Sequence, residues 1–142
     1  MSRRFTPIEC VERVVQYDNG RDKTGYRAIL HDDYQAFVHG QPTASNADDE
    51  ADALDRWWSA CSDVHLEILG MWEQDGVVTL RYRLAGTNDG EFFGRPASGR
   101  KFEVENCTLL EIVDGKVKRV WRYSDTLGLL TQLGLMPGAN IE

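Results

Sequence analysis

The 142-residue sequence lacks long hydrophobic runs, is poor in cysteine and histidine, and carries more acidic than basic residues. No apolar run reaches membrane-spanning length, and the two arginines near the start are not followed by the apolar stretch of a secretory signal. A formal net charge of −7 argues against a surface that binds nucleic acid or anionic lipid. We therefore expect a cytoplasmic protein that binds neither nucleic acid nor membranes.

Cysteine and histidine are too scattered to build a disulfide framework or a metal site. The three cysteines are widely spaced and odd in number, which is typical of reduced cysteines, and the three histidines show no metal-ligand spacing. Glycine-rich nucleotide-binding motifs and the GxSxG nucleophile motif are also absent. We expect no metal site. What is present, 42% hydrophobic and 27% charged residues, suits one globular domain over residues 1–142.

The first 61 residues show helical patterns. Thr6-Pro7-Ile8-Glu9 is a capping box, and the helix that it starts should end at Asn19-Gly20. Apolar spacing predicts a second helix over residues 24–38. A third begins at Asp48-Asp49-Glu50, because acidic side chains suit the positive end of a helix dipole. We interpret this acidic run as a solvated first turn rather than a metal site.

After residue 62 the hydrophobic period changes from helical to alternating. Residues 64–72 and 77–85 read as strands joined at Asp75-Gly76, and residues 101–113 and 117–124 as a second hairpin around Asp114-Gly115. Residues 86–100 form a glycine-rich loop between the hairpins. Helices followed by a bent antiparallel sheet predict an α+β fold with the helices packed on one face.

The turn at Asp114-Gly115 predicts which way the last hairpin faces. If the turn has two residues, Val113 pairs with Lys116, and the remaining pairs follow by counting. One face then carries Ile112 opposite Val117, Leu110 opposite Arg119, Thr108 opposite Trp121, Asn106 opposite Tyr123 and Val104 opposite Asp125. Opposite charges such as Glu111 and Lys118 collect on the other face, as expected of a solvated surface. We therefore predict that Trp121, Tyr123 and Asp125 point toward the helices.

Asp125 has two interpretations that the spacing alone leaves open. Aspartate is among the best helix N-caps, and the leucines that follow it suit a short amphipathic helix. A carboxylate among aromatic side chains is also a candidate for proton transfer in a pocket. The two roles are compatible with each other.

Three stretches resemble a known family: "GTNDGEFFGRPASGRK" (86–101), "EIVDGKVKRVW" (111–121) and, most specifically, "DTLGLLTQLG" (125–134). They are similar to the SnoaL-like polyketide cyclases, or ester cyclases, of the nuclear-transport-factor-two-like superfamily. The resemblance implies a cone-shaped fold with the N-terminal helices packed in a curved antiparallel sheet. It also implies a mostly apolar pocket, and a homodimer formed through the outer face of the sheet.

The resemblance also implies a chemistry. In the cyclases an aspartate matching Asp125 is the general acid/base of an intramolecular aldol condensation that needs no metal or organic cofactor. Asn88 stands where relatives often have a histidine, and an amide cannot take up a proton as imidazole does. A scheme with two acid/base groups at these positions is therefore in question.

We predict Asp125 as the catalytic residue and a set of mostly aromatic side chains as substrate-binding residues. They are Trp121, Tyr123, Asn106, Tyr34, His39, Arg81, Phe37 and Trp58. Each also has a plain structural interpretation. The aromatic residues suit the core, His39 suits the end of a helix, and Arg81 suits an exposed strand face. A buried Arg81 would instead orient a carboxylate by a forked hydrogen bond.

Three functions compete. The first is a cyclase-like enzyme that acts on a polycyclic or aromatic small molecule. The second is an epoxide hydrolase or a ketosteroid-isomerase-like enzyme on the same cone. Epoxide opening needs two carboxylates and an arginine around one water, and the late strands offer no second inward acid. The third is a non-catalytic homodimeric domain that binds a small molecule, because a fold does not fix a function.

Overall fold

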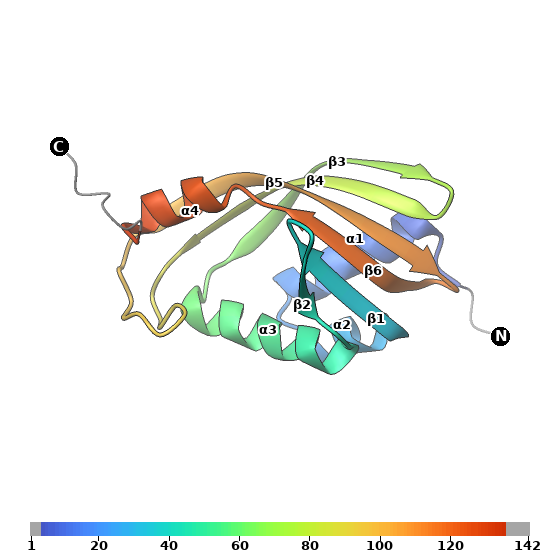
Figure 1. Ribbon diagram of the computed structural model, residues 1–142, viewed down its shortest axis with the longest axis horizontal. Coiled ribbons are helices and arrows are strands. Elements are labelled where there is room, and N and C mark those ends of the chain that lie inside the picture. The colour runs from blue at the N-terminus through green and yellow to red at the C-terminus, as the bar shows by residue number, and fades with distance from the viewer. Residues whose placement is uncertain (1–3, 136–142) are drawn as a thin grey trace.

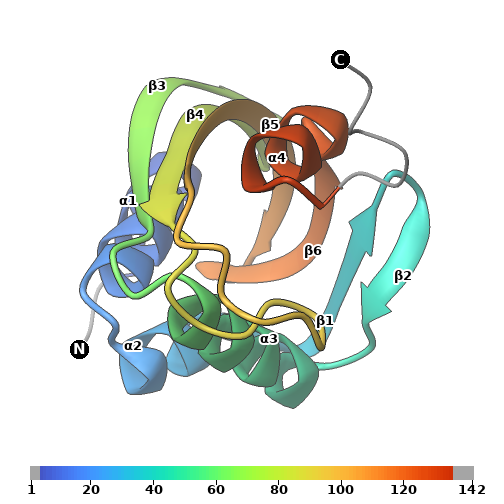
Figure 2. The ribbon, with the colours of Figure 1, turned by 90° about the vertical axis from the view of Figure 1, so that its left-hand side faces the viewer.

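A curved sheet arches over three helices in the computed structural model, which describes residues 4–135 (Figures 1 and 2). The elements in chain order are α1 (Pro7–Asn19), α2 (Lys23–Ala28), β1 (Leu30–Val38), β2 (Gln41–Ala44), α3 (Ala47–Ala60), β3 (His65–Gln74), β4 (Val77–Thr87), β5 (Lys101–Val113), β6 (Lys116–Tyr123) and α4 (Thr126–Leu133). Helices α1, α2 and α3 lie on the concave side of the sheet, and α4 lies against β5 at one end of the molecule. The predicted α+β class and the two late hairpins are confirmed.

The six-stranded sheet of the described residues is mixed. Its strand order is β2-β1-β6-β5-β4-β3, with antiparallel neighbours except for β1 and β6, which run parallel. We expected an antiparallel sheet and a helix where β1 lies. The parallel pair arises because β1 enters the sheet beside β6 after α2, so the N-terminal region supplies strands as well as helices.

The first helix begins as its sequence predicts. The Thr6 hydroxyl accepts from the Glu9 amide at 3.2 Å, and the Glu9 carboxylate accepts from the Thr6 amide at 2.9 Å. Helix α3 is capped in a simpler way, because the Asn46 side chain accepts from the Asp49 amide at 2.8 Å. Both helices therefore start at residues that satisfy otherwise unpaired N–H groups.

The helix predicted over residues 24–38 is wrong beyond its first turns. Helix α2 ends at Ala28, and residues 30–38 form β1, in which Tyr34 and Ala36 are buried. His39 and Gly40, both with positive φ, then turn the chain into β2. The residues of β1 also suit a helical stripe. These residues form a strand because pairing with the free edge of β6 provides backbone hydrogen bonds and burial together.

The predicted register of the last hairpin is correct only near its turn. Val113 pairs with Lys116 and Ile112 with Val117, but Glu111 then pairs with Arg119. Lys118 is the extra residue of a β-bulge, and such an insertion moves every later side chain to the opposite face. The prediction that Trp121, Tyr123 and Asp125 point toward the helices is therefore wrong, and Val120 and Arg122 take the inward positions instead.

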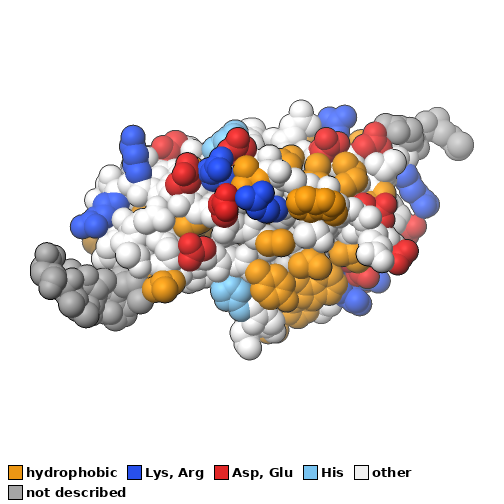
Figure 3. All heavy atoms as spheres, turned by 90° about the horizontal axis from the view of Figure 1, so that it is seen from above, with side chains coloured by type: hydrophobic (Ala, Val, Ile, Leu, Met, Phe, Trp, Pro, Cys, Tyr) orange, Lys and Arg blue, Asp and Glu red, His pale blue; other side chains and the backbone are white. Residues whose placement is uncertain are grey.

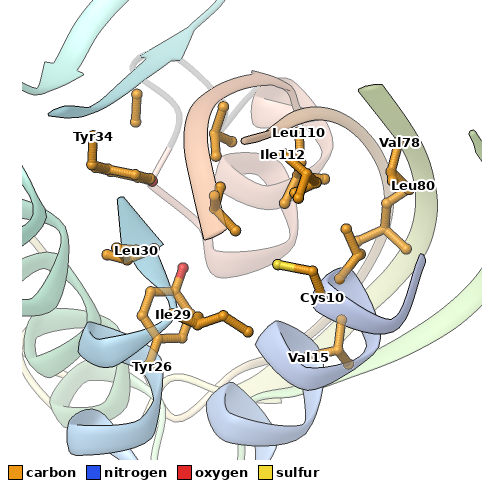
Figure 4. Close-up of a cluster of buried hydrophobic side chains, with 14 of the residues drawn as sticks. Cys10, Val15, Tyr26, Ile29, Leu30, Tyr34, Val78, Leu80, Leu110 and Ile112 are labelled. Atoms are coloured by element: carbon orange, nitrogen blue, oxygen red, sulfur yellow. The ribbon is translucent and has the colours of Figure 1, made fainter. Parts of the chain in front are cut away.

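The interior contains two separate apolar clusters. The larger is formed by α1, α2, β1, β2, α3 and the turn-side halves of β4, β5 and β6, and Figure 4 shows Cys10, Tyr26, Leu110 and Ile112 gathered in it. The smaller includes Val104 on β5 together with residues of α3, α4 and the 88–100 loop. The three cysteines are free, as predicted. Within residues 4–135, no helix is long and apolar enough to cross a bilayer.

Candidate functional site

A group of polar side chains lies where the two apolar clusters meet inside the fold. On β5 the inward residues run from Phe102 and Val104 in the smaller cluster, through Asn106 and Thr108, to Leu110 in the larger one. We call this group the interior polar cluster. It consists of Tyr34, Glu50, Tyr82, Asn106, Thr108 and Arg122. Buried polar groups cost free energy unless they are paired, so their hydrogen bonds determine what the cluster can do.

Its strongest contacts join Arg122, Glu50 and Tyr34. Arg122 Nη2 donates to Glu50 Oε1 at 2.5 Å, and the Tyr34 hydroxyl donates to the same oxygen at 2.5 Å. Glu50 comes from the first turn of α3, Tyr34 from β1 and Arg122 from β6. Three elements far apart in the sequence therefore meet at one carboxylate.

The electrostatics of Glu50 follow from this pairing. Burial alone would raise the pKa of Glu50, but the Arg122 charge and the hydrogen bonds from Tyr34 and Arg122 lower it by more. Burial raises the pKa of Tyr34, and the neighbouring Glu50 charge adds to this effect, so the phenol stays protonated and donates. The interpretation of Glu50 as part of a solvated first turn is wrong, because only 5% of the residue is exposed.

A second carboxylate, Asp18 at the end of α1, lies in the same electrostatic environment. The Trp58 indole donates to its Oδ1 at 3.1 Å. Burial raises the pKa of Asp18, and the Trp58 hydrogen bond and the Arg122 charge lower it only partly. Of the aromatic residues predicted to bind substrate, Trp58 thus reaches the interior, where it packs against both apolar clusters.

The other half of the interior polar cluster is more loosely bonded. Asn106 Nδ2 and Thr108 Oγ1 approach the Tyr82 hydroxyl at 3.5 and 3.4 Å. Asn106 Oδ1 accepts the backbone N–H of Asp125 at 2.9 Å. Thr108 is the strand partner of Arg122, which brings the two halves side by side on the sheet. The prediction that Tyr34 and Asn106 face the interior is confirmed.

Asp125 itself is exposed and caps α4. Its Oδ1 accepts the Gly128 amide at 2.8 Å, so the capping interpretation of this residue is confirmed. The predicted apolar cavity around its side chain is wrong, because the bulge at Lys118 alters the register that placed it there. The bond from its backbone to Asn106 nevertheless holds Asp125 next to the interior polar cluster.

Four other predicted site residues lie outside the cone. Phe37 and Trp121 stack on the outer face of the sheet, with ring centroids 6.4 Å apart. Tyr123 is half exposed, and Arg81 pairs with Glu105 at 3.3 Å on the same outer side. The predicted inward orientation of Phe37, Trp121 and Tyr123 is wrong, whereas Arg81 lies on an exposed strand face, as its structural interpretation predicted. For Tyr123 and Trp121 the cause is the bulge, and for Phe37 it is the replacement of the predicted helix by β1.

His39 lies in the turn between β1 and β2, not at the end of a helix. Its Nε2 accepts the Ser124 amide at 3.0 Å, and its ring stacks on Tyr123 with centroids 6.2 Å apart. This contact ties the β1–β2 turn to the chain just before Asp125. His39 therefore supports the segment that carries Asp125 from the outside.

Asn88 is a structural residue. It is fully buried, its Nδ2 donates to the carbonyls of Ala60 and Gly90 at 3.1 and 2.8 Å, and its Oδ1 accepts from the Ser98 amide at 2.9 Å. These bonds fix both ends of the loop that follows β4. An amide supplies two donors and an acceptor together, which suits this role.

Sequence reasoning missed Glu50, Arg122, Tyr82 and Thr108. The alternation of Asn106 and Thr108 with apolar residues on β5 could have pointed to an inward polar stripe. The spacing of apolar and polar residues along β6 does not indicate the bulge that turns Arg122 inward.

Comparisons with known proteins agree with this architecture. The family model described as "SnoaL-like polyketide cyclase" matches residues 8–133. The chain is 33% identical over 132 residues to the aklanonic acid methyl ester cyclase DauD of Streptomyces sp. (strain C5), covering 89% of this chain and 81% of that protein. It is 30% identical over 133 residues to the aklanonic acid methyl ester cyclase DnrD of Streptomyces peucetius, covering 91% of each. The chain belongs to the SnoaL-like polyketide cyclase family.

Solved structures show the same fold. TsrD from Streptomyces laurentii superposes with a TM-score of 0.82 at 26% identity, over 96% of this chain and all of that one. A SnoaL-like polyketide cyclase from Agrobacterium tumefaciens superposes with a TM-score of 0.76 at 18% identity, covering 92% of this chain and 99% of that one. The expected nuclear-transport-factor-two-like cone is therefore confirmed.

Proposed function

We propose that this protein is a cyclase that closes a ring of a polycyclic or aromatic polyketide by cofactor-independent acid/base chemistry of the aldol type. The observation that carries the proposal is the match to two aklanonic acid methyl ester cyclases over most of both chains. The interior polar cluster between two apolar clusters supports it, because such a ligand needs apolar walls and a few fixed polar groups.

In this proposal Asp125 is the proton-transfer group. An aldol closure needs a proton taken from carbon, an enolate held, and a proton delivered to the new oxygen. Asp125 is solvent-accessible, and its backbone is fixed on Asn106 of the interior polar cluster. The helix cap uses Oδ1, which leaves Oδ2 of the carboxylate for a proton.

Replacing Asp125 by asparagine tests the role without removing the cap. The wild type is incubated with aklanonic acid methyl ester and with related aromatic polyketide methyl esters, and products are followed by chromatography and mass spectrometry. Asp125→Asn should lower turnover by a factor of about 10² to 10⁴, the usual contribution of general acid/base catalysis. Turnover that survives in Asp125→Asn would remove Asp125 from the mechanism.

The chain offers a matched control in Asp22. This aspartate caps α2 as Asp125 caps α4, accepting the Gly25 amide at 2.8 Å. Asp22→Asn should leave turnover at the wild-type level. If no methyl ester is turned over by the wild type although one binds, the non-catalytic binder replaces the cyclase.

One observation favours a second candidate, an epoxide hydrolase. The expectation concerned the late strands alone, and the acids come instead from two helices: Glu50 of α3 and Asp18 of α1 both lie within electrostatic reach of Arg122. Two carboxylates and an arginine are the groups that this chemistry requires. Incubation with polycyclic epoxides in ¹⁸O-water, with the diol analysed by mass spectrometry, tests it. A labelled diol formed by the wild type and lost in Asp18→Asn would favour the hydrolase.

We also propose a homodimer formed through the outer face of the sheet. Figure 3 shows hydrophobic side chains gathered on this face beside a group of mixed charges. Trp72 is 60% exposed and Tyr123 half exposed, and the stacked Phe37 and Trp121 lie on the same face. Contiguous exposed apolar side chains are typical of interaction sites. Light scattering should give twice the chain mass for the wild type and a smaller mass for Trp121→Glu, and a monomeric wild type contradicts the proposal.

A further inference from the structure

Arg122 is a cation that solvent reaches on the concave side of the sheet, while its counter-ion is hidden. The Arg122 side chain is 26% exposed and that of Glu50 only 6%. Burying a charge costs free energy, so the enclosed Glu50 carboxylate requires a close cationic partner. Here the Glu50 carboxylate is enclosed, and part of the Arg122 side chain remains accessible.

The position of the guanidinium is fixed before any ligand arrives. Glu50 holds Nη2, and Glu50 is held in turn by the hydroxyl of the fully buried Tyr34. A guanidinium has five N–H donors in a rigid planar arrangement, and the bond to Glu50 uses one of them. Glu50 and Tyr34 already order the Arg122 side chain. Binding of a ligand oxygen to Arg122 therefore costs little further side-chain entropy.

The surroundings suit an apolar ligand that carries an oxygen. Thr108 lies opposite Arg122 on β5, and Asn106 and Tyr82 extend the polar stripe across the sheet. Apolar clusters adjoin this stripe on both sides. Asp18 and Glu50 are the nearby acids, so an additional anion is favoured only where it contacts Arg122 directly.

We propose that Arg122 binds an anionic oxygen of a planar aromatic ligand, a phenolate or an enolate, inside the cone. The proposal rests on the proposed function for the identity of the reacting oxygen, because an aldol closure passes through an enolate. A guanidinium fixed beside that oxygen stabilises the charge as it develops. Arg122 thereby becomes the oxygen-binding partner of the proton-transfer group.

A binding measurement tests this without any turnover. The probe is alizarin, a planar hydroxyanthraquinone with an acidic phenol, compared with its 2-methyl ether, which lacks the corresponding phenolate. Both are titrated at pH 8 while tryptophan fluorescence is recorded, since Trp58 lies beside Asp18 at the interior. The wild type should bind alizarin about tenfold or more tightly than the ether, as expected for a hydrogen bond to a charged group.

The double variant Glu50→Gln/Arg122→Met separates ligand binding from folding. It removes both charges together, so that no buried charge is left alone. The affinity ratio of alizarin to its ether should fall to about one, with the affinity for the ether retained. Arg122→Lys is the second variant, which keeps the charge but loses the planar fork, and it should lower the ratio severalfold.

Three results would overturn the proposal: no saturable binding of alizarin to the wild type, equal affinities for the two probes, or an undiminished ratio in the folded variants. These outcomes are distinct from those of the cyclase experiment. Discrimination by Arg122 without any turnover would leave the oxygen site standing and remove the cyclase. Turnover by the wild type together with equal affinities for the two probes would support the cyclase and remove the oxygen site.

Discussion

The two faces of the curved sheet carry the same kinds of ion pair with very different surroundings. On the concave side, Arg122 pairs with Glu50 among buried residues. On the outer side, Arg81 pairs with Glu105, and both side chains are about half exposed. The residue types and the Arg–carboxylate chemistry are alike, so the difference lies in the access of water. Desolvation of the inner pair costs a large free energy that only complete pairing offsets. For the outer pair both the desolvation cost and the net attraction are small.

The largest effect is expected when the inner pair is broken from one side. Glu50→Gln removes the carboxylate charge and leaves the Arg122 guanidinium without its counter-ion. We expect a loss of about 3 kcal/mol in the free energy of unfolding, at the low end of the usual cost of breaking a buried ion pair, because the Arg122 side chain is 26% exposed. Urea unfolding followed by circular dichroism measures it. The double variant Glu50→Gln/Arg122→Met should recover most of the loss, and a single-variant loss below about 1 kcal/mol would contradict the buried-pair interpretation.

The pH dependence of stability should separate the two interior acids. The folded pKa of Glu50 is lowered, so its ionised form stabilises the fold above the usual pKa of 4.5, and this contribution is lost as the pH falls through the folded pKa. The folded pKa of Asp18 is raised, so the fold loses stability as the pH rises from 3.8 through the folded pKa.

Asp18→Asn should therefore raise the melting temperature at pH 7, and the gain should vanish below pH 3.8, where aspartate is protonated in both states. Asparagine keeps an oxygen for the Trp58 indole, so the comparison isolates the charge. Thermal unfolding of both proteins from pH 3 to pH 8 gives the result. A gain that is equal at all pH values would show that the charge of Asp18 is not the cause.

A smaller effect is expected at Asp125, which lies at the boundary between the two faces. Asp125→Ala removes the helix cap on α4 and should lower the free energy of unfolding by about 1 kcal/mol. Asp22→Ala removes the equivalent cap on α2 and should cost a similar amount. Chemical denaturation measures both. A much larger loss at Asp125 than at Asp22 would show that its carboxylate stabilises more than the helix end.

The smallest effect is expected on the outer face. Arg81→Gln breaks the exposed pair with Glu105 and should change the free energy of unfolding by about 0.2–1 kcal/mol. This change should shrink further in 1 M salt, where exposed charges are screened. A loss comparable to that of Glu50→Gln would remove the contrast between the two faces.

Much of the fold can be predicted from local patterns, and the failures have identifiable causes. The capping box at Thr6, the turns at Asp75-Gly76 and Asp114-Gly115, and the cap at Asp125 are local, so they appear in the structure where the sequence predicts them. The helix prediction for residues 30–38 failed because their side chains suit both a helix and a strand. Pairing with the free edge of β6 selects the strand.

The candidate site was harder to predict than the fold. Tyr34 and Asn106 were found because they are inward polar residues with apolar neighbours. Arg122 was missed because one bulged residue, Lys118, reverses the alternation on β6. As a result, Trp121 and Tyr123, which lie on the outer face, were predicted as site residues in place of their neighbour Arg122.

By itself, the sequence determined the class of fold, the late hairpins and their turns, and the starts of α1, α3 and α4, because each depends on residues within a few positions of one another. Its motifs also determined the family. Only the tertiary structure decided which side of β6 is buried, that β1 is a strand, and that Glu50, Tyr34 and Arg122 meet. These outcomes depend on contacts between segments that are distant in the sequence. Tyr34 and Arg122, for example, are 88 positions apart. A periodicity of two residues cannot specify them once a single bulge changes which face each residue occupies.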